Sequence, residues 1–173
     1  KPYKINYGGT TMKIVATVGT QLPFDRLIRG LDSWAECNPE VEVFAQIGST
    51  HYEPRHMHWA RMISASCFRD NIGQCDTIVA HAGMGTIISG VEYGKRIVIM
   101  PRREEFGEHR NDHQLGTAKR MTKQFGVEVV HNDDQLADAL DAVIDVSEQA
   151  VTELCASPEL ISEIRQFAGL EAR

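Results

Sequence analysis

Residues 76–114 read DTIVAHAGMGTIISGVEYGKRIVIMPRREEFGEHRNDHQ, and this stretch decides the fold. An apolar run ends in His81, a turn containing Gly83 and Gly85 follows, and a helical pattern opens at Thr86. This order predicts a strand, a tight turn and a helix N-terminus. The first backbone N–H groups of a helix have no partner within it, and the helix dipole is positive at that end. The stretch therefore predicts an anion site, although a structural turn with a satisfied histidine is the alternative.

The second half of the stretch places a polar loop after another apolar run, at 97–100. Guanidinium and amide side chains follow it: Arg102, Arg103, Asn111 and Gln114. Guanidinium groups can neutralise a pyrophosphate, and amides offer the donors and acceptors that sugar hydroxyls need. An exposed basic loop and a polar helix cap are the alternative interpretations. A phosphate site followed by a polar cluster suggests a pocket for a nucleotide sugar, with Gln114 as the preferred sugar contact.

Two further pairs of residues extend this site. Gly19 and Thr20 follow the first apolar run, so their backbone amides could meet a diphosphate, unless they form an ordinary turn between strand and helix. Ser89 and Glu92 lie three and six residues beyond Thr86, on one face of the predicted helix. Either side chain could reach the hydroxyls of a ribose, and a solvent-exposed helix residue is the alternative for Glu92.

The alternation of strands and helices continues on both sides of the stretch. We expect strands at 13–18, 41–47, 56–62, 77–80, 96–100 and 127–130. We expect helices from 24 to before Asn38 and at 66–72, 86–93, 110–124, 133–146 and 157–169. Short β-rich runs separated by helices predict an α/β fold with a Rossmann-like, doubly wound, mainly parallel sheet. In such folds ligands bind at the carboxyl ends of the strands, where both glycine turns fall.

Composition restricts the function classes. The 173 residues suffice for one domain, and a formal net charge of −6 argues against general nucleic-acid binding. Four widely spaced cysteines predict reduced thiols with no disulfide framework, and no apolar run of 18 residues or signal peptide is apparent. His56 and His58 share a strand face without an evident third ligand, so no metal site is predicted. Residues 1–11 lack periodicity and are interpreted as a leader or an expression remnant, which leaves 12–173 as the domain.

Two segments carry a family resemblance. Residues 16–28 read ATVGTQLPFDRLI, and together with residues 81–114 they resemble the C-terminal domain of family 28 glycosyltransferases. The resemblance implies a single C-terminal lobe of the two-lobed GT-B architecture. It is strongest for stand-alone versions of the domain, which are subunits of split bacterial exopolysaccharide transferases and of the dolichol-pathway GlcNAc transferase. It covers the chain from Met12 to about residue 146.

By this resemblance the chain binds a UDP-sugar donor and needs no other cofactor. Gly19 and Thr20 would lie beside the diphosphate, and Gln114 would contact hydroxyls of the donor sugar. The phosphates would be held at the helix N-terminus by His81, Gly83, Gly85 and Thr86. Relatives usually carry a ribose-binding glutamate at the position of Ser89, so Glu92 could substitute for it here.

The resemblance also implies a partner. We expect a membrane-anchored, acceptor-binding subunit that presents a lipid-linked oligosaccharide and supplies the general base, so no catalytic residue is assigned to this chain. The reaction would transfer a hexose to a polyprenyl-diphosphate acceptor with inversion. The chain would then be cytoplasmic, peripheral on the inner face of the plasma membrane, and able to self-associate when isolated. The alternatives are a non-catalytic nucleotide-sugar-binding regulatory module and a hydrolysing epimerase.

Overall fold

The computed structural model describes residues 12–111 and 113–147. The segment 1–11 and the helix expected at 157–169 lie outside the described residues. Within the described part the strands are β1 (Lys13–Thr17), β2 (Glu42–Gln46), β3 (His58–Ala60), β4 (Thr77–His81), β5 (Arg96–Met100) and β6 (Glu128–Val129). The helices are α1 (Asp25–Cys37), α2 (Ala65–Gln74), α3 (Met84–Glu92), α4 (His113–Phe125) and α5 (Asp133–Ser147), with a 3-10 turn η1 (Glu104–Phe106).

The strands form one parallel sheet in the order β3-β2-β1-β4-β5-β6. This confirms the predicted doubly wound α/β fold. From β1 in the middle of the sheet the chain builds outward through β2 to β3, and then returns to β4 on the other side of β1. The reversal creates a switch point between β1 and β4, where parallel α/β sheets bind ligands at the strand carboxyl ends.

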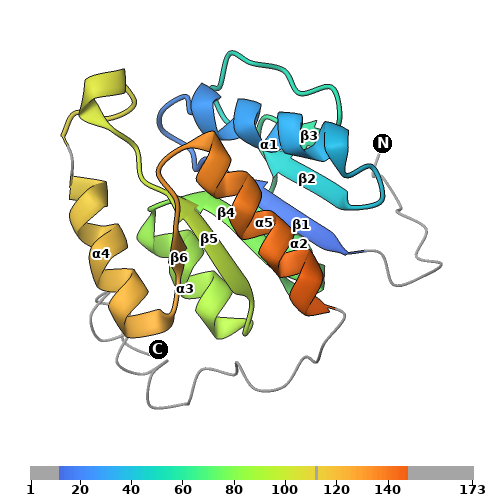
Figure 1. Ribbon diagram of the computed structural model, residues 1–173. Coiled ribbons are helices and arrows are strands. Elements are labelled where there is room, and N and C mark those ends of the chain that lie inside the picture. The colour runs from blue at the N-terminus through green and yellow to red at the C-terminus, as the bar shows by residue number, and fades with distance from the viewer. Residues whose placement is uncertain (1–11, 112, 148–173) are drawn as a thin grey trace.

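Helices cover both faces of this sheet and enclose two apolar cores. Figure 1 shows α5 lying across the sheet beside α1. Alternate residues of β1 point to opposite faces, so Ile14 and Ala16 join the core under α1 and α5, whereas Val15 joins the core under α2, α3 and α4. Burial on both faces explains why the strands read as continuous apolar runs rather than as alternating patterns.

Two predicted details are wrong at the helix that follows β4. The predicted helix begins at Thr86, but α3 begins at Met84, with Gly83 as its N-cap in an extended conformation. The sequence predicts a turn as far as Gly85, yet Gly85 adopts helical geometry inside the first turn of α3. The segment after β5 also contains η1, which has no apolar periodicity and was not predicted.

Candidate functional site

Two glycine turns enclose the imidazole of His81 at the switch point. Thr17 pairs with Ala80 in the sheet, so the Gly19 turn after β1 lies next to the end of β4. Gly19 has a φ of +76°, and a Cβ added there would lie 2.7 Å from His81 Cε1. A Cβ added at Gly83 would collide with His81 Nε2. Both turns therefore need glycine because the ring occupies the space of a side chain.

The His81 ring is held in its neutral form. Burial of the ring and the nearby charges of Arg102 and His109 lower the pKa of His81 to about 4, while the Thr17 backbone acts in the opposite direction. Its Nδ1 is buried and has no hydrogen-bond partner among the described residues. A neutral imidazole at pH 7 can donate one hydrogen bond without adding a full charge to the site.

Three hydrogen bonds among Thr17, Gly19 and Gln46 hold the Gly19 turn in place. The Gly19 N–H donates to Thr17 Oγ1 (3.2 Å), and the Thr17 hydroxyl lies 2.5 Å from Gln46 Oε1. Gln46 Nε2 donates back to the Gly19 carbonyl (3.0 Å). Both polar groups of the Gly19 backbone are thus engaged within the protein, whereas Thr20 is exposed beside them. Sequence reasoning missed Thr17 and Gln46, which lie 29 residues apart in the chain.

The N-terminus of α3 lacks a side-chain cap. The Gly83 N-cap supplies no side chain, whereas α2 is capped by Ser64, whose Oγ accepts from the Cys67 N–H at 3.2 Å. The first-turn N–H groups of α3 cannot bond within the helix, so they are suited to an anion. Thr86 lies in this turn and is 9% exposed, and a Cβ added at Gly85 would enter open space.

Arg102 is a buried residue that binds the backbone of the first loop. It is 2% exposed, and its guanidinium donates to the carbonyls of Val18 (2.8 Å), Leu22 (2.8 Å) and Pro23 (2.5 Å). Burial lowers the pKa of Arg102 to about 10, so it stays charged at neutral pH. Arg102 is therefore not part of an exposed basic loop, and its positive charge acts on His81 from a buried position.

The other predicted residues of the polar loop differ in their surroundings. Arg103 is half-buried and pairs with Glu105 (2.5 Å between Nη2 and Oε1). Gln114 is 5% exposed, and its Oε1 accepts from the Arg102 backbone N–H at 3.0 Å, which joins α4 to the end of β5. Asn111 is exposed at the end of the loop.

The two candidate ribose contacts lie at different distances from the N-terminus of α3. Ser89 is half-buried and lies about 4.5 Å beyond Thr86 along the helix axis, and exposed Glu92 lies about 9 Å beyond it. Ser89 is therefore the nearer of the two to the helix N-terminus.

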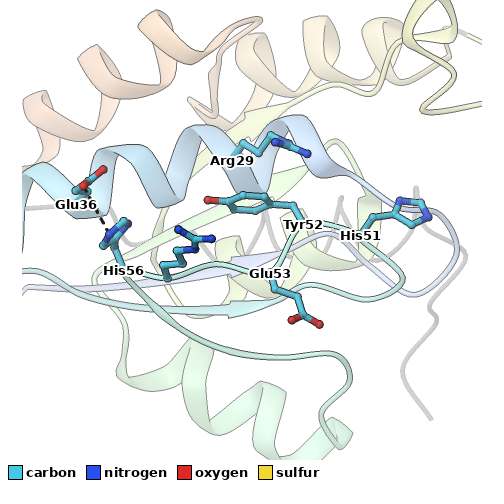
Figure 2. A pocket seen from close by; sticks show the side chains of 7 residues that line it. Arg29, Glu36, His51, Tyr52, Glu53 and His56 are labelled. Carbon is cyan, nitrogen blue, oxygen red and sulfur yellow. Dashed lines mark ion pairs between the residues drawn. The ribbon is translucent and has the colours of Figure 1, made fainter.

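A hollow of about 780 Å³ lies along α1, and none of the predicted site residues lines it. Figure 2 shows Arg29, Tyr52 and His56 around it. Beneath it the carboxylate of Asp32, 1% exposed, accepts from the Tyr52 hydroxyl at 2.6 Å and from the His56 backbone N–H at 2.8 Å. These bonds attach the segment after β2 to α1, so the contacts beneath this hollow serve the fold.

The described residues contain neither a candidate metal site nor a candidate membrane span. No group of three histidine, cysteine or carboxylate side chains in 12–111 and 113–147 is arranged to hold a metal ion. Across the same residues, no helix combines the length and the apolar character that a membrane span requires.

Comparison with known proteins supports the fold and the family. The model of the glycosyltransferase family 28 C-terminal domain matches residues 13–161. No curated protein gives a significant match. Among solved structures, the glycotransferase of kitacinnamycin has a TM-score of 0.63 at 19% identity over 96% of this chain and 41% of its own.

Two other solved structures share the same lobe. MurG of Acinetobacter baumannii has a TM-score of 0.55 at 17% identity, over 92% of this chain and 46% of its own. The UDP-GlcNAc 2-epimerase of Neisseria meningitidis, bound to UDP-GlcNAc, has a TM-score of 0.58 at 9% identity, over 94% and 45%. The chain thus spans less than half the length of each of these three proteins.

Proposed function

The chain belongs to the glycosyltransferase family 28 C-terminal domains, and from this membership we propose that it is the donor-binding subunit of a two-component, inverting glycosyltransferase. The donor is a UDP-hexose, and the acceptor is a polyprenyl-diphosphate-linked saccharide of exopolysaccharide synthesis. One observation carries the proposal: a neutral, glycine-enclosed His81 stands beside an uncapped helix N-terminus at the switch point of the sheet.

The diphosphate of the donor is proposed to bind at the first turn of α3. The N–H groups of this turn and the Thr86 hydroxyl donate to its oxygens, and His81 donates a ring N–H. Gln114 uses Oε1 for the Arg102 backbone, so its Nε2 is the atom that we assign to a sugar hydroxyl. Ser89 is the ribose contact favoured by its position along α3.

The proposed reaction is a single displacement at the anomeric carbon. The acceptor hydroxyl oxygen forms a bond to this carbon while the bond from the carbon to the UDP oxygen breaks, with inversion. The electron pair of the broken bond stays on the diphosphate, where the dipole and amides of α3 stabilise it. The proton of the hydroxyl goes to a base that we assign to the partner chain.

The partner is proposed to be a membrane-anchored, acceptor-binding lobe. Support comes from the family resemblance, which is strongest for stand-alone versions of this domain. The active cleft would form between the two chains on the cytoplasmic face of the plasma membrane. A regulatory module that binds a nucleotide sugar without transfer is the alternative, and it differs in giving no turnover when the partner is present.

Titration calorimetry with UDP tests donor binding. The wild-type chain should bind UDP, and Thr86→Val should bind it about tenfold more weakly because a buried hydroxyl that meets phosphate is lost. Thr86→Ser keeps the hydroxyl and is the matched control. The proposal would be wrong if the wild-type chain did not bind UDP, or if Thr86→Val bound it as tightly as Thr86→Ser.

A further inference from the structure

Two loops approach His81 and contain little regular structure of their own. The loop at 18–24 follows β1 and contains the Gly19 turn, and the loop at 101–108 follows β5 and contains η1. The Gly19 turn of the first loop abuts the imidazole, and Arg102 of the second loop donates to the Val18 carbonyl of the first. Arg26 and Glu108, neither of which was predicted from the sequence, join them.

Arg26 projects from the first turn of α1 toward the end of β5. Its Nε and Nη2 each donate to one carboxylate oxygen of Glu108 at 2.8 Å, which is a two-point ion pair. Nη2 also donates to the Pro101 carbonyl (3.1 Å), and Nη1 donates to the His131 carbonyl (2.9 Å). A planar guanidinium is needed for this set of contacts because its N–H groups point in fixed directions.

Glu108 closes the loop at 101–108 on itself. Its carboxylate, 9% exposed, accepts from the Arg103 backbone N–H at 2.9 Å in addition to Arg26. Its backbone N–H donates to the Arg103 carbonyl (3.1 Å), and its carbonyl accepts from Arg102 Nη1 (3.2 Å). The two ends of the loop are therefore held together at this one residue.

Arg102 connects the loop at 101–108 to the loop at 18–24. Its contact with the Val18 carbonyl lies one residue before Gly19, whose turn abuts His81. Two guanidinium groups approach the Phe24 ring, with Arg102 at 4.6 Å and Arg26 at 5.4 Å from its centroid. The ion pair, the Phe24 ring and Arg102 thus form one continuous set of contacts between the loops.

Resting on the proposed function, we propose that Arg26 and Glu108 are positioning residues of the donor site. Their ion pair holds the loop at 18–24 against the loop at 101–108, and so sets the space that encloses His81. Neither side chain is required to touch the donor.

The test uses three single variants of the full chain. Glu108→Gln keeps the shape of the side chain but removes its charge, and Arg26→Lys keeps the charge but loses the two-point geometry. Glu53→Gln is the matched control because Glu53 forms an ion pair with Arg61 (2.7 Å) in which both side chains are at least half exposed. UDP affinity is measured by calorimetry, Tm by circular dichroism, and the His81 titration by NMR.

We expect Glu108→Gln and Arg26→Lys each to weaken UDP binding at least tenfold, and Glu53→Gln to change it less than twofold. Loosening the loops admits water to the imidazole, so the pKa of His81 should rise toward 6.5 in the two site variants. If Glu108→Gln does not fold, Arg26→Lys provides the same two measurements.

A lower Tm with unchanged UDP affinity and an unchanged His81 titration would show that the pair serves stability alone, and would overturn the inference. If the wild-type chain does not bind UDP, the proposed function fails. The NMR titration of His81 then still decides whether the pair positions the loops.

Discussion

At the scale of single residues, the absence of a side chain does not have the same physical cause at every glycine of the site. Gly19 and Gly83 make room for the His81 imidazole, so the fold itself accounts for them. Gly85 has no atom within 4 Å of an added Cβ, and its backbone lies in an ordinary helix. Nothing in the described protein requires glycine there, whereas a phosphate at the helix N-terminus would.

Gly85→Ala should therefore separate stability from binding. Alanine has the higher helix propensity, so the free energy of unfolding should stay equal or rise by up to about 1 kcal/mol. UDP affinity should fall at least tenfold, because the methyl group would stand where the phosphate binds. Urea unfolding and calorimetry check the two effects.

Gly116→Ala is the control for this substitution. Gly116 is exposed in α4 and also has nothing within 4 Å of an added Cβ. It should gain similar stability and bind UDP normally. Equal UDP affinity in both variants would show that the phosphate does not bind at the first turn of α3.

Burial of neutral His81 makes stability depend on pH. Its folded pKa, about 4, lies below the ordinary 6.5, so protonation favours the unfolded chain. The stabilising contribution is complete above pH 6.5 and is lost as pH falls toward 4. Between pH 7 and pH 5 this residue alone should remove about 2 kcal/mol of unfolding free energy.

His81→Asn lacks the titrating group, so the test compares its urea unfolding with that of the wild type at both pH values. The wild type should lose more stability than the variant over this interval. Equal losses would show that His81 titrates normally in the folded protein.

At the scale of elements, local sequence signals predict the strands and helices, whereas contacts between residues far apart in the chain are not predicted. The strand expected at 96–100 is β5, because four consecutive apolar residues, 97–100, lie between a glycine turn and a proline. Helix α3 begins two residues before the predicted Thr86, since glycine is compatible with both a turn and a helix N-terminus. Of the site, His81 and its glycines follow from the strand–turn–helix order. The pairs Thr17–Gln46 and Arg26–Glu108 could not be predicted, because 29 and 82 residues separate their members.

The attachment of the segment after β2 to α1 is another such contact, and it depends on Asp32. Asp32→Ala would leave the Tyr52 hydroxyl and the backbone N–H groups of Arg55 and His56 without their acceptor. We expect it to lower the free energy of unfolding by about 3 kcal/mol, measured by urea unfolding at pH 7.

Glu36→Ala on the same helix is the comparison, because the Glu36 side chain is 63% exposed. It should lower the free energy of unfolding by less than about 0.5 kcal/mol. The hydrogen bonds to Asp32 outweigh burial and lower its pKa, so its contribution is present above pH 3.8 and is lost as pH falls through the folded value. A loss of stability at pH 7 no larger than that of Glu36→Ala would contradict the role assigned to Asp32.

At the scale of the whole molecule, one sheet edge gathers the proposed donor contacts. Strand order places the ends of β1, β4 and β5 side by side, and the loops that follow them bring together His81, Arg102 and the Gly19 turn. In the proposed function, His81 and the first turn of α3 at this edge meet the diphosphate of the donor, and Gln114 meets its sugar. The proposal therefore separates two properties: donor binding belongs to this chain, and turnover requires a second chain.

The isolated chain should bind UDP yet consume UDP-hexose at the background rate, as followed by UDP release. Adding a membrane-anchored, acceptor-binding subunit and a polyprenyl-diphosphate acceptor should start turnover, and the anomeric coupling constant of the product, read by NMR, should show inversion. Thr86→Val should reduce this turnover with the partner present. A retained configuration would exclude single displacement, and UDP binding without turnover in the reconstituted pair would favour the regulatory module. Hydrolysis or epimerisation of UDP-sugar by the isolated chain would place the catalytic groups on this lobe, contrary to the assignment of the base to the partner.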